Sequence, residues 1–276
     1  MSKSILITGA STGIGYFVAH QLKQAGYQVI ASCRKPADVL RLQQEGLHAV
    51  QIDLNNTASI QQGFNQTLEI TGGSLYGLFN NGAYGQPGAV EDLSRAALRE
   101  QFETNVFGWC ELTTLALPIM LKQGSGRIVQ NSSVLGISAM PLRGAYNASK
   151  YAIEGISDTL RLELKGTGVH VSLIEPGPIR SEFRKNALAA LQRNIDIDRS
   201  RHRESYQIAI DRLGKETSTT PFTLGPDAVY QRVVHALESM HPQARYYVTV
   251  PTYLVGFMKR ILPVFLLDKL LQKLGS

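Results

Sequence analysis

The sequence predicts a single α/β domain with a doubly wound, mainly parallel sheet and helices on both faces. Short β-branched runs alternate with longer amphipathic stretches, a glycine-rich turn follows the first run, and no linker divides the chain. The chain has 276 residues, of which 43% are hydrophobic and 18% are charged. This length and composition suit a large core, so we assign residues 1–276 to one domain.

Seven short runs are predicted to be strands, and helical patterns separate them. The first helical pattern, IGYFVAHQLKQAG at 14–26, closes with Gly26, which suits a helix C-terminus. Right-handed crossovers between parallel strands place ligands at the carboxyl ends of the strands. The predicted strands are 4–8, 28–33, 48–53, 75–81, 126–133, 169–176 and 245–250.

Charge and cysteine content argue against several classes of function. The formal net charge is +6, and basic residues concentrate at 180–203, but acidic residues interleave with them. Without an aromatic-and-basic stripe, we predict no nucleic-acid site. Cys33 and Cys110 have no metal-ligand spacing, so we predict no metal site. Because neither a secretory leader nor an uninterrupted bilayer-spanning run is apparent, we expect a cytoplasmic protein.

A glycine-rich turn lies between the first predicted strand and the first predicted helix. Glycine permits a tight turn and lets backbone N–H groups approach a diphosphate, and the helix N-terminus favours that anion. The position of this turn at the first strand–helix junction favours dinucleotide binding over a plain turn. The residues expected to bind the dinucleotide here are Gly9, Ser11, Thr12, Gly13, Ile14 and Gly15.

Tyr146 lies four residues before Lys150, in GAYNASKYAIEG, so the two side chains share one face of a helix. An unperturbed phenol has a pKa of about 10, which is high for proton transfer near neutral pH. A neighbouring ammonium favours the phenolate and lowers that pKa. We therefore predict that Tyr146 is a general acid/base and that Lys150 adjusts its pKa.

Taken together, the motifs resemble the short-chain dehydrogenase/reductase family. They are Thr-Gly-x3-Gly-x-Gly at 8–15, LFNNGAYG at 78–85 and Tyr146-x3-Lys150, and the resemblance runs from about residue 4 to about residue 182. It implies a Rossmann-type fold, a nicotinamide cofactor, and a homodimer or tetramer. It also implies that Lys150 holds the nicotinamide ribose.

The resemblance adds further catalytic and cofactor residues. Ser133 matches the serine that orients the carbonyl, with Ser132 left open as a one-residue slip, and Asn105 matches the asparagine of a water-mediated proton relay. Asn80 would brace neighbouring strands. The other positions implied to contact cofactor are Asn81, Gly82, Pro176, Gly177, Ile179 and Ser181.

Arg34 and Lys35 follow the second predicted strand, where the adenosine ribose would lie. Cys33 stands where the family's NAD enzymes usually carry an acidic residue, and a guanidinium suits a 2′-phosphate, so NADP(H) is favoured over NAD. Two solvated surface cations are the alternative. Asp53 and Leu54 are expected to contact the adenine, with a turn-capping role for Asp53 equally open.

Two segments beyond the resemblance bear on the substrate and location. Residues 182–225 are expected to form a substrate lid, and residues 252–276 an amphipathic C-terminal extension. In the latter, one predicted helix face carries Leu266, Leu267, Leu270, Leu271 and Leu274. Peripheral membrane contact, a cover for the pocket and a subunit contact all remain open for this face.

The predicted function is hydride transfer between NADP(H) and a small carbonyl or alcohol substrate. The sequence is similar overall to family members that act on hydroxysteroids, retinoids and lipophilic aldehydes, which favours an apolar aldehyde or ketone. The alternative is a non-catalytic NADP(H)-binding sensor or interaction protein. Ser133, Tyr146 and Lys150 are all present, which favours the enzyme.

Overall fold

The computed structural model describes residues 3–215 and 221–275, so residues 216–220 of the predicted lid lie outside the described residues. The described residues form a sheet of seven strands in the order β3-β2-β1-β4-β5-β6-β7. Every neighbouring pair is parallel, which confirms the predicted fold class. The strands are β1 Ser4–Ile7, β2 Gln28–Cys33, β3 His48–Gln51, β4 Gly77–Asn80, β5 Gly126–Asn131, β6 Val169–Glu175 and β7 Arg245–Tyr247.

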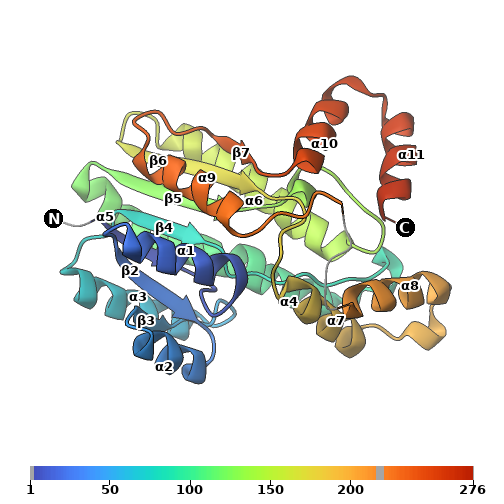
Figure 1. The fold of residues 1–276 in the computed structure, drawn as a ribbon, viewed down its shortest axis with the longest axis horizontal. Coiled ribbons are helices and arrows are strands. Elements are labelled where there is room, and N and C mark those ends of the chain that lie inside the picture. The colour runs from blue at the N-terminus through green and yellow to red at the C-terminus, as the bar shows by residue number, and fades with distance from the viewer. Residues whose placement is uncertain (1–2, 216–220, 276) are drawn as a thin grey trace.

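Helices cover both faces of this sheet, as Figure 1 shows. The α-helices are α1 Gly13–Gln24, α2 Pro36–Gln44, α3 Thr57–Thr71, α4 Arg95–Phe102, α5 Gly108–Gln123, α6 Gly144–Glu163, α7 Phe183–Asn194, α8 Arg203–Gly214, α9 Asp227–Glu238, α10 Val250–Ile261 and α11 Val264–Gly275. Short 3₁₀ turns are η1 Val90–Asp92, η3 Val134–Gly136 and η4 Ile197–Arg199, and η2 Glu103–Phe107 is a π-helical turn.

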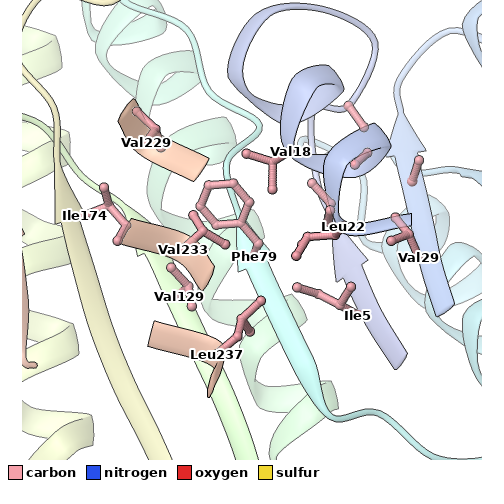
Figure 2. Close-up of a cluster of buried hydrophobic side chains, with 14 of the residues drawn as sticks. Ile5, Val18, Leu22, Val29, Phe79, Val129, Ile174, Val229, Val233 and Leu237 are labelled. Atoms are coloured by element: carbon pink, nitrogen blue, oxygen red, sulfur yellow. The ribbon is translucent and has the colours of Figure 1, made fainter. Parts of the chain in front are cut away.

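Successive side chains of each strand point to opposite faces of the sheet, and this divides the core into two layers. Ile5 and Ile7 of β1 pack against α1, α2 and α9, whereas Leu6 between them packs against α3, α5 and α6. Because both faces are covered, the strands are apolar at nearly every position. Figure 2 shows the first layer, in which Phe79 of β4 lies among Val18 of α1 and Val233 of α9.

Several strands end one to three residues before the predicted boundaries. β3 stops at Gln51, β5 at Asn131 and β7 at Tyr247, all at the carboxyl edge of the sheet. At this edge the chain turns away from the ladder; for example, the Ser132 N–H donates to the Gln130 carbonyl. Ser132 and Ser133, which follow β5, line the site described below.

The predicted lid and tail both contain helices. Helices α7 and α8 form the described part of the lid, and Tyr206 of α8 is fully buried against the main body. Pro263 separates α10 from α11. In the predicted leucine face, Leu271 is buried but Leu266 remains 41% exposed, so that face is only partly covered. None of the helices within the described residues is long and apolar enough to cross a membrane.

Replacing Phe79 with alanine should lower the free energy of unfolding by about 3–5 kcal/mol, because it empties a closed space between the sheet and two helices. Denaturant titration measures the loss. Leu40→Ala is the matched control, since Leu40 is 59% exposed, and should change the stability by less than about 0.5 kcal/mol. Equal effects of the two substitutions would contradict the packing described here.

Candidate active site

A cavity of about 470 Å³ opens at the carboxyl edge of the sheet. Its walls come from the turn between β1 and α1, the ends of β4, β5 and β6, the first turns of α6, and helices α7 and α8. Ligands of doubly wound sheets bind at this edge. The cavity is therefore the candidate active site.

The glycine turn forms one end of the cavity. Gly9 and Gly13 have φ of 65° and 59°, which favours glycine. A Cβ on Gly15 would lie 2.4 Å from the Gly9 carbonyl oxygen, so this position must also be small. Thr12 precedes α1 and makes no side-chain capping hydrogen bond within the described residues. The first N–H groups of α1 are thus left for an anion, and the cradle fits a dinucleotide diphosphate.

Asn81 ties the ends of three strands together behind this turn. Its Nδ2 donates to the carbonyls of Thr8 (3.0 Å) and Gly9 (3.2 Å), and its Oδ1 accepts from Asn131 Nδ2 at 2.9 Å. Asn80, predicted to brace neighbouring strands, instead donates its side-chain N–H to Thr113 of α5 at 3.1 Å. The prediction for Asn80 was therefore wrong, because its side chain points toward the helix layer.

Arg41 is a contact of the glycine turn that the sequence analysis missed. Its Nη2 donates to the Ser11 carbonyl at 2.6 Å, and its guanidinium lies 5.5 Å from the Tyr16 ring centroid. An ion pair with Glu45 at 2.8 Å fixes the side chain. The spacing of Arg41 and Glu45 was visible in the sequence, but the contact with Ser11 depends on the packing of α2 against the turn.

Tyr146 and Lys150 lie on α6 and both line the cavity. Lys150 is 1% exposed; its Nζ donates to the Asn131 carbonyl at 2.7 Å and lies 4.4 Å from the Trp109 ring centroid. The same nitrogen is 5.6 Å from the centroid of the Tyr146 ring. The predicted sharing of one helix face therefore brings phenol and ammonium together beneath the cavity.

Burial dominates the proton affinities of this pair. Burial raises the pKa of Tyr146 to about 12, while the neighbouring Ser133 hydroxyl and the Arg143 guanidinium act in the opposite direction. Burial also lowers the pKa of Lys150 to about 7, opposed by the carboxylate of Glu154. The prediction that Lys150 lowers the pKa of Tyr146 is therefore not met in the cofactor-free protein, because burial raises the pKa of the phenol and also lowers the pKa of the ammonium.

Ser133 and Ser132 occupy different surroundings, although both line the cavity. Ser133 lies beside Tyr146, and its Oγ accepts from the Leu135 N–H at 3.1 Å. Ser132 lies beside Glu154. A Cβ added to Gly136 would lie 2.5 Å from Ser132 Oγ and 3.0 Å from Glu154 Oε1, so the two side chains border the same small space. The serine beside the phenol is the one that the sequence analysis favours.

Asn105 lies in the π-helical turn η2 and is fully buried, but it does not line the cavity. Its amide exchanges hydrogen bonds with the backbone of Tyr84, at 2.9 and 3.2 Å, and donates to Ser149 Oγ at 3.2 Å. Ser149 in turn donates to the Tyr146 carbonyl at 2.8 Å. Asn105 thus supports the first turn of α6 from behind.

A buried acidic cluster beneath the site was not predicted. Arg245 of β7 bridges Glu154 (3.1 Å), Asp158 (2.7 Å) and Glu175 (3.2 Å). Burial, followed by the charge of Glu154, raises the pKa of Glu175 to about 8. The position of Glu154 four residues after Lys150 was visible in the sequence, whereas its contact with β6 and β7 required the fold.

The segment after β6 closes the other side of the cavity. Pro176, Gly177, Ile179 and Ser181 all line it, as the sequence analysis expected for a segment over the nicotinamide. The Phe183 ring at the start of α7 packs against Tyr146 with 5.3 Å between centroids.

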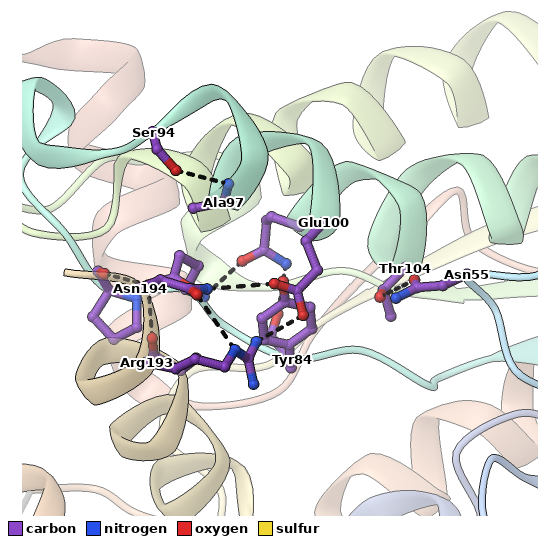
Figure 3. Close-up of polar contacts among 12 residues, drawn as sticks. Asn55, Tyr84, Ser94, Ala97, Glu100, Thr104, Arg193 and Asn194 are labelled. Atoms are coloured by element: carbon purple, nitrogen blue, oxygen red, sulfur yellow. Dashed lines mark hydrogen bonds and ion pairs between the residues drawn. The ribbon is translucent and has the colours of Figure 1, made fainter.

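Polar contacts hold the far end of α7 to α4, as Figure 3 shows. Arg193 pairs with Glu100 at 2.7 Å, and Asn194 donates to Gln86 Oε1 at 2.7 Å. In the same view, Thr104 hydrogen-bonds to Asn55. The contacts of Arg193 and Asn194 fix the C-terminal end of α7 against α4 and the segment after β4.

Asn81 and Gly82, predicted to contact the adenosine side, line this cavity, whereas the other residues predicted there, Arg34, Lys35, Asp53 and Leu54, lie outside its lining. Arg34 and Lys35 are exposed directly after β2. Asp53 Oδ1 accepts from the Asn55 N–H at 3.0 Å, which is the capping role left open for it. Leu54 is 8% exposed and packs near Gly82, where a Cβ would meet it at 3.1 Å.

The described residues contain no cluster of three or more His, Cys, Asp or Glu side chains that could hold a metal ion. The groups that the cavity brings together are a phenol, an ammonium, a serine hydroxyl and a glycine cradle. This arrangement can position a dinucleotide and deliver a proton to an oxygen near Tyr146.

Comparison with known proteins agrees with this geometry. Residues 3–192 match a family model described as short chain dehydrogenase. The chain is 45% identical over 272 residues to "Uncharacterized oxidoreductase YbbO" of Escherichia coli (strain K12), covering 99% of this chain and 95% of that protein. It is 29% identical over 276 residues to the NADPH-dependent 3-dehydrocapnine reductase of Ornithobacterium rhinotracheale, covering 97% and 95%.

A solved structure of a short chain dehydrogenase/reductase from Burkholderia phymatum in complex with NAD has a similar fold. The TM-score is 0.77 at 25% sequence identity, and the match covers 94% of this chain and 92% of that chain. The architecture described above is therefore one that is known to hold a nicotinamide dinucleotide.

The depressed pKa of Lys150 should make stability depend on pH. The pKa of Lys150 is about 7 in the folded protein and 10.5 ordinarily. At pH values between these two, Lys150 binds a proton in the unfolded chain but not in the folded one. The free energy of unfolding should therefore rise with pH across this window, relative to Lys150→Met, by up to about 1.4 kcal/mol per pH unit.

Denaturant titrations of cofactor-free wild type and Lys150→Met at several pH values measure this difference. The exposed Lys165→Met serves as the control and should change the stability by less than about 0.5 kcal/mol. A constant difference for Lys150→Met between pH 7 and 10 would contradict the assignment.

Proposed function

This chain belongs to the short-chain dehydrogenase/reductase family, and we propose that it is an NADP(H)-dependent oxidoreductase acting on an apolar aldehyde or ketone. One observation carries the proposal: Tyr146, Ser133 and Lys150 line the same cavity as the glycine turn. Apolar side chains cover much of the wall beside Tyr146, in keeping with an apolar substrate. These side chains are Val134, Leu135, Met140, Phe183 and Leu213.

The nicotinamide, when bound, exchanges a hydride with the substrate carbon. During reduction, the Ser133 hydroxyl donates a hydrogen bond to the carbonyl oxygen and orients it. The Tyr146 hydroxyl gives its proton to that oxygen as negative charge develops there. The phenolate that remains is stabilised by the Lys150 ammonium, which is held nearby through the Asn131 carbonyl. Oxidation of an alcohol uses the same groups in reverse.

Preference for NADP(H) is supported by the end of β2. Arg34 and Lys35 are exposed where the adenosine ribose of a doubly wound fold lies, and Cys33 precedes them in place of an acidic residue. A guanidinium can pair with two oxygens of a 2′-phosphate. The relative from Ornithobacterium rhinotracheale, which is named as NADPH-dependent, adds support.

We further propose a cytoplasmic homodimer or tetramer. Support comes from the exposed apolar side chains of the C-terminal helices, which a subunit contact would cover. Peripheral contact with a membrane is the other use of such a surface. These side chains include Tyr253, Leu254, Phe257, Ile261, Val264 and Phe265, which are between 52% and 73% exposed.

Replacing Tyr146 with phenylalanine should lower kcat for aldehyde reduction by about 10²–10⁴-fold, because the proton donor is removed. NADPH binding should persist. Tyr151→Phe is the matched control, since Tyr151 lies on the same helix and is 41% exposed. Full activity of Tyr146→Phe would refute the role of Tyr146 as the general acid. If the wild type turned over no substrate in a broad carbonyl and alcohol panel, a non-catalytic NADP(H)-binding sensor would be favoured instead.

Replacing Arg34 with alanine should weaken NADPH binding about 10- to 100-fold and leave NADH binding nearly unchanged, because charge-assisted hydrogen bonds to the 2′-phosphate are lost. Calorimetric titration of each cofactor gives both dissociation constants. Arg95→Ala, an exposed change on α4, is the control. Wild-type preference for NADH would overturn the assignment of Arg34.

A further inference from the structure

Three arginine side chains line the cavity around Tyr146. Arg143 directly precedes α6, Arg184 lies in the first turn of α7, and Arg212 lies near the end of α8. Separate elements therefore bring three guanidinium groups into one half-buried space. The hydride-transfer mechanism proposed above uses none of them to bind substrate.

These arginines have no acidic partner within residues 3–215 and 221–275. Nη1 and Nη2 of Arg184 are buried and make no hydrogen bond with the part of the chain that the structure describes. Arg143 donates to the carbonyl of its own neighbour, Leu142, at 3.2 Å. Glu182 also lines the cavity, but it is exposed and pairs with none of the three.

Two other arginines of the same helices are paired. Arg193 binds Glu100 at 2.7 Å, and Arg203 binds Asp198 at 2.9 Å. Among the described residues, Arg184 and Arg212 differ from these helix neighbours in facing the cavity and in having no acidic partner. Burying guanidinium groups without a counter-charge is unfavourable. An anionic ligand that binds beside them would supply the missing counter-charge.

The three charges also repel one another. Burial, and then the charge of Arg212, lowers the pKa of Arg143 to about 10. Burial, and then the charge of Arg184, lowers the pKa of Arg212. Arg143 is in turn close enough to Tyr146 to lower the pKa of the phenol. The cluster therefore extends from the two lid helices to the reacting end of the cavity, and an anion there would relieve the repulsion.

We infer that Arg143, Arg184 and Arg212 form a subsite for an acidic group, such as a carboxylate, that the carbonyl substrate carries on its apolar body. Planar guanidinium groups suit an oxyanion because each can donate two parallel hydrogen bonds. This inference rests on the proposed function and narrows its substrate class to oxo acids. The glycine turn supplies its own N–H groups for the cofactor diphosphate, which leaves the arginines for the substrate.

The experiment compares oxo acids of four to ten carbons with their methyl esters as substrates for NADPH oxidation. For the best chain length, wild type should have a higher kcat/KM for the acid than for its ester. In Arg212→Met, the ratio of the two kcat/KM values should fall about 10- to 100-fold, because charged hydrogen bonds are lost. Arg212→Lys should retain part of the ratio, and Arg184→Met should repeat the loss.

Arg203→Met is the control, since Arg203 lies on the outer side of α8 with a 69% exposed side chain. This substitution should leave the ratio unchanged. Wild type that uses acid and ester equally would overturn the subsite. So would arginine variants that weaken NADPH binding while keeping the wild-type ratio, because the arginines would then belong to the cofactor.

A binding measurement separates failure of the subsite from failure of the proposed chemistry. Decanoate and decanol are titrated by calorimetry into protein saturated with NADP⁺, which needs no turnover. Tighter binding of decanoate, lost in Arg212→Met, would support the subsite even if no carbonyl were reduced. Equal binding of the two compounds, together with no preference for any oxo acid, would refute it.

Discussion

The buried ammonium of Lys150 is the group on which the rest of the site depends. It donates a hydrogen bond to the Asn131 carbonyl, contacts the Trp109 ring and has Glu154 as its counter-charge. These partners come from β5, α5 and α6, so the position of one nitrogen is fixed by three elements of the core layer. In the proposed mechanism, a cation held this way would stabilise charge on the phenol without moving.

The acidic cluster beneath the site extends this support to the edge of the sheet. Arg245 comes from the last strand, β7, and holds together carboxyl groups from α6 and β6. A buried ion pair adds little net stability, but removal of one partner is strongly destabilising because it leaves an uncompensated charge. The cluster therefore fixes the relative positions of α6, β6 and β7, and with them the position of Lys150 on α6.

The sequence predicted the parts of the site that depend on local spacing. The glycine turn and the Tyr146–Lys150 pair need only a strand–helix junction and one helix face, and both are readable over a few residues. Arg41, Glu175 and Arg212 were missed because their roles arise from contacts between distant segments. Asn80 was misassigned since neighbouring positions in a strand face opposite layers, and the sequence does not say which of two adjacent asparagines turns toward the helices.

The cations of this basic chain lie both on its surface and in its cavity. A net charge of +6 suggested anionic partners, and the sequence offered the basic segment at 180–203 as the place to look. Within that segment, Arg193, Arg199 and Arg201 are paired with acidic residues on the surface, whereas Arg184 turns inward without a partner. Within this segment, three surface arginines are therefore neutralised, whereas the guanidinium of Arg184 has no acidic partner among the described residues. In the subsite inferred above, such a guanidinium would favour a small anion that fits the cavity over an extended polyanion that would bind a surface.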